Sequence, residues 1–96
     1  MGLREVKACA VQRIREGRIF HVPREYVKNE FAQGAVTAEQ VIAMIESCRG
    51  DRYETRPHDS DRSVIVHIFR PRGRYDGYYV KCFFLDPDIW FISVHR

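Results

Sequence analysis

The residues best suited to chemistry are arginines and tyrosines that follow one another between positions 70 and 79. Three arginines of the segment RPRGR (70–74) stand close to Tyr75, Tyr78 and Tyr79. An arginine side chain can grip a phosphate with two hydrogen bonds and can stack on a base. Binding of single-stranded RNA uses this combination of phosphate grip and stacking surface. The alternative is a charged hairpin tip that discourages pairing at a sheet edge.

The chain as a whole also favours arginine, with thirteen arginines against three lysines. A GC-rich genome would produce this bias without any functional reason, so the placement of the arginines matters more than their number. The formal net charge is only +3. Bulk charge therefore does not by itself indicate a nucleic-acid binder.

Length and composition indicate one cytoplasmic domain, residues 1–96. The hydrophobic fraction of 45% is that of an ordinary globular protein. We expect no membrane partner, because no segment approaches the roughly 20 apolar residues of a membrane span. We also expect no signal peptide, because the N-terminus is charged at once. Three cysteines without paired spacing fit a reducing compartment.

Three helices are predicted in the first half of the chain. Residues 3–16 carry apolar side chains at helical spacing. A second helix is predicted over 23–33, beginning at a proline, which suits a first helical position. The third begins at the capping-box pattern TAEQ (37–40) and ends near residue 50. Between the first two helices, residues 18–22 form a short strand or an extended link.

Strands are predicted in the second half, at 51–56, 63–70, 77–85 and 89–95, where β-branched and aromatic residues concentrate. The fold class is therefore α+β, with N-terminal helices on one face of a mostly antiparallel sheet of three or four strands.

Strand alternation predicts which side chains share a face. Glu54 lies with Arg56, and Tyr79 lies with Lys81. Arg70 lies with Val66 and Ile68, whereas His67 points to the other face. His95 lies with Ser93 and Phe91.

The segment DRYETRPHDSDRSVIVHIFRPR (51–72) resembles the centre of the MqsR toxins, a branch of the RelE-type mRNA interferases. Shared features are a D-x-Y segment, a Ser-Asp turn and a long strand that ends in aromatic-Arg-Pro-Arg. A Gly-x-Tyr-hydrophobic-Lys segment (77–81) follows. Residues 3–7 and 17–19 also resemble the opening helix and first strand of that family, so the likeness covers most of the chain.

The resemblance implies a RelE-like fold and a toxin that cleaves mRNA, either free or on the ribosome. It also implies a cognate antitoxin protein, expected to bind DNA, that holds the toxin inactive. Three polar positions of the family differ here. Glu54 and His95 stand where the family has lysines, and Val66 stands where it has a catalytic glutamine.

The differences at positions 54 and 95 suggest that other catalytic side chains replace those of the family, rather than that catalytic side chains are lost. Other RelE-type toxins and small ribonucleases use a carboxylate base, one or two arginines and a histidine acid. Glu54, Arg56, Arg70 and His95 resemble that set.

Metal-free RNA cleavage needs a base for the 2′-hydroxyl, an acid for the departing 5′-oxygen and cations for the phosphorane. We assign Glu54 as base and His95 as acid, since histidine can carry a proton near neutral pH. Arg56 and Arg70 would hold the phosphate, and Tyr79 would supply a hydroxyl donor or a stacking surface. The cations expected to contact RNA nearby are Arg72, Arg74 and Lys81.

Each assignment has a simpler alternative. Glu54 with Arg56 could be a solvated surface pair of little energetic worth, and His95 could be an incidental surface residue. His58 near two aspartates matches no zinc spacing, so neither a metal nor a cofactor is predicted.

The rival functions share the scaffold, so the fold alone does not decide between them. One is a non-enzymatic toxin that poisons a protein such as gyrase, as the ParE branch does. Another is a catalytically dead RNA- or protein-binding module, for which Val66 is the best argument. The third is a small regulatory domain with the same order of helices and strands.

Overall fold

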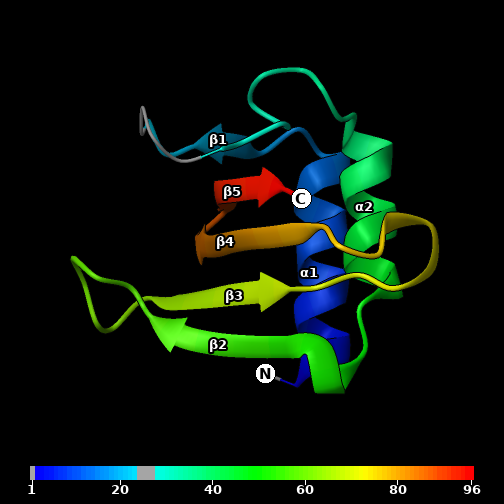
Figure 1. Cartoon of the computed structure of the whole chain (residues 1–96). Coiled ribbons are helices and arrows are strands. Elements are labelled where there is room, and N and C mark those ends of the chain that lie inside the picture. Colours follow the sequence, from blue (N-terminus) through cyan, green and yellow to red (C-terminus); the bar gives the residue numbers. More distant parts are fainter. Residues whose placement is uncertain (1, 24–27) are drawn as a thin grey trace.

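The computed structural model describes residues 2–23 and 28–96, which form two α-helices and five β-strands (Figure 1). The elements are α1 (Leu3–Arg15), β1 (Ile19–His21), α2 (Ala38–Ser47), β2 (Tyr53–Pro57), β3 (Ile65–Phe69), β4 (Tyr79–Leu85) and β5 (Asp88–His95). Short 3-10 helices, η1 (Gly50–Arg52) and η2 (Gly73–Tyr75), precede β2 and β4. Within the described residues, neither α-helix is long and apolar enough to cross a membrane.

The strands form one sheet in the order β1-β5-β4-β3-β2, and both helices lie on the same side of it (Figure 1). The four strands from the second half of the chain pair antiparallel, as predicted. The fifth strand, β1, pairs parallel with β5 through Ile19–Ile89 and His21–Phe91. The predicted α+β class is thus confirmed, and residues 19–21 extend the sheet beyond the expected three or four strands.

Local sequence signals explain where α2 begins and which face of α1 is buried. The predicted capping box opens α2, because the Thr37 hydroxyl accepts from the Gln40 backbone at 3.2 Å and the Gln40 side chain accepts from the Thr37 backbone at 2.8 Å. In α1, the stripe of Val6, Ala10 and Ile14 is buried against the sheet. Both helices therefore place an apolar face on the same core.

The helix predicted over 23–33 is wrong for the described part of that stretch, and its residues 24–27 lie outside the description. Asn29 instead forms a parallel bridge with Val94 of β5, and a turn follows it. The Asn29 side chain accepts a hydrogen bond from the Ala32 backbone at 3.0 Å. Asparagine side chains that satisfy nearby backbone groups compete with helix formation, and here the bridge to β5 adds to that competition.

The two faces of the sheet differ in what covers them. The face under α1 and α2 carries the main core, to which the sheet contributes Phe69, Val80, Cys82, Ile89, Phe91 and Val94. The opposite face carries a smaller apolar cluster of Val66, Ile68, Phe83 and Ile92. No described helix lies on this second side, which we call the uncovered face.

A β-bulge in β5 changes which of its side chains reach the uncovered face. Lys81 pairs with Ser93 and Cys82 pairs with Phe91, so Ile92 has no partner on β4. An extra residue of this kind shifts the alternation by one position. His95 therefore shares the uncovered face with Ser93 but not with Phe91, and the prediction that all three lie together is wrong.

Candidate functional site

The side chains predicted to act on RNA lie in neighbouring rows across the uncovered face. Cross-strand partners point to the same side of a sheet, so the strand pairing fixes each row. One row crosses four strands and consists of Glu54, Ile68, Lys81 and Ser93. The row beside it holds Tyr79 and its partner His95, with Arg70 directly after β3.

Glu54 lies between two arginines. Its Oε1 accepts a hydrogen bond from Arg70 Nη1 at 2.9 Å, and Arg56 Nη2 lies 3.3 Å from both carboxylate oxygens. The bond from Arg70 is the main reason why the pKa of Glu54 is lowered, and the charge of Arg56 adds to it. The carboxylate is therefore ionised throughout the neutral range, as a proton acceptor must be.

The series continues from Arg70 through two stacked rings. The guanidinium carbon of Arg70 lies 5.2 Å from the Tyr79 ring centroid, which is within the range of a cation–π contact. The Tyr79 and His95 rings stack with centroids 5.6 Å apart. His95 Nδ1 donates to the backbone oxygen of Arg96 at 2.7 Å. The neutral ring then has its lone pair on Nε2, and the protonated ring has its second proton there.

The structure thus brings together all the side chains assigned to the reaction in one series, in the order Arg56, Glu54, Arg70, Tyr79 and His95. The strands that carry the two ends, β2 and β5, are three strand spacings apart, roughly 14 Å at the backbone. A base and an acid for in-line displacement must stand on opposite sides of the phosphorus. Arg70 and Tyr79 lie between Glu54 and His95 in this series.

The other arginines of the segment 70–74 have different surroundings. Arg72 forms an ion pair with Asp51, and the guanidinium of Arg74 lies 5.6 Å from the Tyr75 ring centroid. The Tyr75 ring packs against the helix-side core. The arginines predicted to form one cluster at the hairpin tip therefore have separate partners. That Arg72 and Arg74 contact RNA stays a prediction.

Lys81 lies beside the series in a hollow of about 180 Å³ that Arg56 and His58 also line. Sequence analysis considered His58 only as a metal ligand and missed this position. The backbone N–H of His58 donates to the Val64 carbonyl at 2.9 Å, so the pairing continues one residue beyond β2. Alternation over 54, 56 and 58 was the signal that could have found it.

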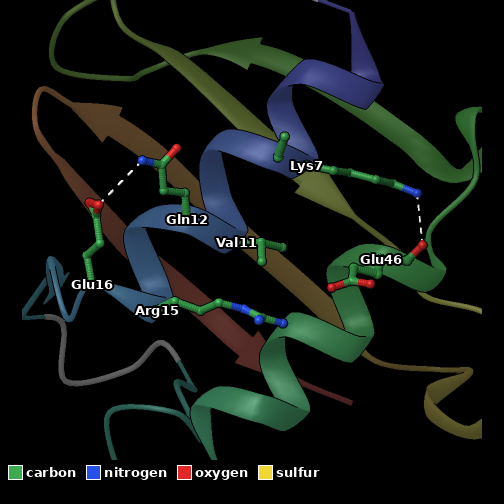
Figure 2. Close-up of a pocket in the computed structure, with 7 residues that line it drawn as sticks. Lys7, Val11, Gln12, Arg15, Glu16 and Glu46 are labelled. Atoms are coloured by element: carbon green, nitrogen blue, oxygen red, sulfur yellow. Dashed lines mark hydrogen bonds between the residues drawn. The ribbon is translucent and has the colours of Figure 1, made fainter.

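Another hollow lies away from these residues, between α1 and α2 (Figure 2). It measures about 500 Å³, and Val11 and Arg15 of α1 face into it. At its edge, Lys7 Nζ donates to the Glu46 carbonyl at 2.9 Å. None of the side chains predicted to act on RNA lines this hollow. Across residues 2–23 and 28–96, no three histidine, cysteine, aspartate or glutamate side chains gather as a metal site would require.

Comparison of the chain with protein-family models, with curated proteins and with solved structures found no match in any of the three. The geometry of the uncovered face and the resemblance carried by residues 51–72 are therefore the features that bear on function.

Proposed function

We propose that this protein is a metal-independent endoribonuclease with a RelE-like fold, and the toxin of a toxin–antitoxin pair of the MqsR branch. The observation that carries the proposal is the unbroken series from Arg56 to His95 on the uncovered face. It combines an ionised carboxylate, two guanidinium groups, a phenol and an imidazole. These are the groups that phosphodiester cleavage by the adjacent 2′-hydroxyl requires.

In the proposed reaction, Glu54 takes the proton of the 2′-hydroxyl while O2′ forms a bond to phosphorus. The bond from phosphorus to O5′ breaks, and His95 gives its proton to that oxygen. The products are a 2′,3′-cyclic phosphate and a free 5′-hydroxyl. Exchange with water then removes the proton from Glu54 and returns one to His95.

Arg70 has two functions in this scheme. It would bind a non-bridging phosphate oxygen and stabilise the charge that develops on the phosphorane. A phosphate that draws Arg70 away from Glu54 would also remove the main cause of the low pKa of that carboxylate. Glu54 would then become a stronger base once the substrate is bound.

The test is cleavage of single-stranded RNA in the presence of a chelator. We expect the unaltered protein to cut and to leave a 2′,3′-cyclic phosphate, and Arg70→Ala to lower the rate by about 100- to 1000-fold, the usual cost of losing one preorganised donor. Arg4→Ala removes the same charge from an exposed site on α1 and should leave the rate unchanged. Cleavage that is unaffected by Arg70→Ala contradicts the assignment.

The toxin part of the proposal has its own test. Expression in the cytoplasm should stop growth through loss of mRNA, and co-expression of a neighbouring reading frame should restore growth. Absence of toxicity in every host tested would instead favour an RNA- or protein-binding module on the same scaffold.

A further inference from the structure

The hollow beside the proposed cleavage site has walls of mixed charge and an apolar floor. Its volume is about 180 Å³, and it is lined by Arg56, Pro57, His58, Asp59, Val66, Lys81 and Ile92. Val66 and Ile92 belong to the small apolar cluster of the uncovered face. Two permanent cations and one imidazole thus stand around a floor that offers water no hydrogen bonds.

The cations of this hollow are available to a ligand. Among the residues that the structure describes, no carboxylate lies within ion-pairing distance of the Lys81 ammonium group. Arg56 contacts Glu54 at 3.3 Å, whereas Arg70 holds the same carboxylate at 2.9 Å. The Arg56 side chain is also 58% exposed, so it can turn toward an anion at the hollow.

The hydrogen bonding of His58 makes it a donor. The Ser60 backbone N–H donates to His58 Nδ1 at 3.0 Å, so the neutral ring carries its proton on Nε2. The ring also packs edge-on against Phe83, with centroids 4.9 Å apart. His58 is thus fixed at the hollow with one N–H to offer an acceptor. Asp59 opposes anion binding at the rim, where its side chain is exposed.

The aromatic rings beside the hollow indicate what kind of anion would come here. Phe20 and Trp90 stack with centroids 4.9 Å apart, and Trp90 and Phe83 lie nearly parallel at 6.2 Å. Phe20 ends this series with 46% of its surface exposed. Rings of this kind, next to a cationic groove, stack with the bases of single-stranded nucleic acid.

We infer that the hollow formed by Arg56, His58 and Lys81 holds the phosphate of a nucleotide flanking the cleaved bond, whose neighbouring base stacks on the exposed ring of Phe20 at the end of the stack with Trp90 and Phe83. This subsite rests on the proposed nuclease function for the identity of its substrate. It adds His58 and the aromatic rings to the residues that contact RNA. The ligand class is therefore a single strand that spans at least two phosphates.

Binding can be measured apart from cleavage with a short 2′-O-methyl RNA oligonucleotide, which lacks the attacking hydroxyl. Trp90 is the only tryptophan of the chain, so its fluorescence reports on the stacked rings. We expect saturable quenching by the oligonucleotide. Lys81→Ala and His58→Ala should each weaken binding by about tenfold, as loss of one charge-assisted or buried hydrogen bond does.

Lys7→Ala is the matched control, because it removes the same charge from the helix layer, and it should bind like the unaltered protein. Thermal unfolding and circular dichroism establish that each variant is folded. Equal affinity of the Lys81 and His58 variants and the unaltered protein overturns the subsite, as does a response to inorganic phosphate with none to the oligonucleotide. Binding that follows the expected pattern without cleavage of ordinary RNA would support the subsite and refute the nuclease.

Discussion

The two faces of the sheet use alternate residues of the same strands for different purposes. On β4, Val80 and Cys82 are fully buried beneath the helices, whereas Tyr79 and Lys81, which alternate with them, remain partly exposed on the uncovered face. The helix-covered face carries the main apolar core. The uncovered face keeps charged groups around a small apolar cluster. One face therefore supplies most of the buried apolar core, and the other presents charged and polar side chains.

The histidines follow the same division. On the helix side, His67 Nδ1 lies 2.7 Å from the Tyr53 hydroxyl, and burial lowers the pKa of His67. On the uncovered face, His95 is partly exposed and stacks on the Tyr79 ring. A buried, neutral histidine serves packing, whereas an accessible one can exchange protons with a substrate. Both residues belong to one sheet, and they lie on its opposite faces.

The largest expected effect on stability is loss of an aromatic ring from the helix-covered face. Phe91 is fully buried against Phe31, and Phe91→Ala should lower the free energy of unfolding by about 3–5 kcal/mol. Phe20→Ala, which removes the same group from the uncovered face, should cost only about 1 kcal/mol. Urea denaturation measures both, and equal losses would contradict the division between the faces.

Loss of a side chain assigned to the reaction on the uncovered face should slow cleavage and leave stability nearly unchanged. Glu54→Gln and His95→Gln should each slow single-turnover cleavage by about 100-fold, equivalent to about 2.7 kcal/mol. Stability should change little, because exposed ion pairs contribute little. Glu39→Gln, an exposed change on α2, is the control. If both variants cut at the full rate, a mechanism that uses Tyr79 and Lys81 becomes preferable.

A smaller effect on stability is expected at the polar pair of Tyr53 and His67 on the helix side of the sheet. Tyr53→Phe removes the hydroxyl that lies 2.7 Å from His67 Nδ1 and should cost about 1 kcal/mol of unfolding free energy. The cleavage rate should not change, because neither residue reaches the uncovered face. A slower reaction in this variant would show that the two faces are coupled.

The smallest effect concerns pH. Burial lowers the pKa of both His21 and His67 in the folded protein. Below about pH 6.5 the unfolded chain takes up protons that these rings resist, so stability is complete above that pH and declines as the pH falls. His67→Gln should make the decline between pH 7 and pH 5 shallower in urea titrations. An unchanged slope would mean that His67 does not contribute to it.

Much of the fold followed from local patterns. The capping box at Thr37 predicted the start of α2, and the β-branched and aromatic runs predicted four strands. The failures occurred where distant contacts compete with local preference. A helix is predicted over 23–33, but Asn29 pairs with Val94, which lies 65 positions away in the chain. Such a pairing leaves no local signal.

In the candidate site, too, predictions from the local sequence failed where contacts between strands decide the outcome. Alternation correctly grouped Glu54 with Arg56, and it correctly separated His67 from Arg70. It failed at His95, because the bulge opposite Lys81 shifts β5 by one residue. It also missed His58, whose strand pairing continues through the Val64 carbonyl. A bulge and an extended ladder are properties of two strands together.

The sequence by itself determined the class of the fold and which residue types could serve phosphate chemistry, because helix caps, strand runs and the chemical groups of side chains are local properties. Only the tertiary structure decided that Glu54, Arg70 and His95 meet on one face, since that depends on strand order. It also decided that β1 joins the sheet in parallel and that no described helix covers the opposite side. These outcomes depend on how separate segments pack, and no single segment encodes them.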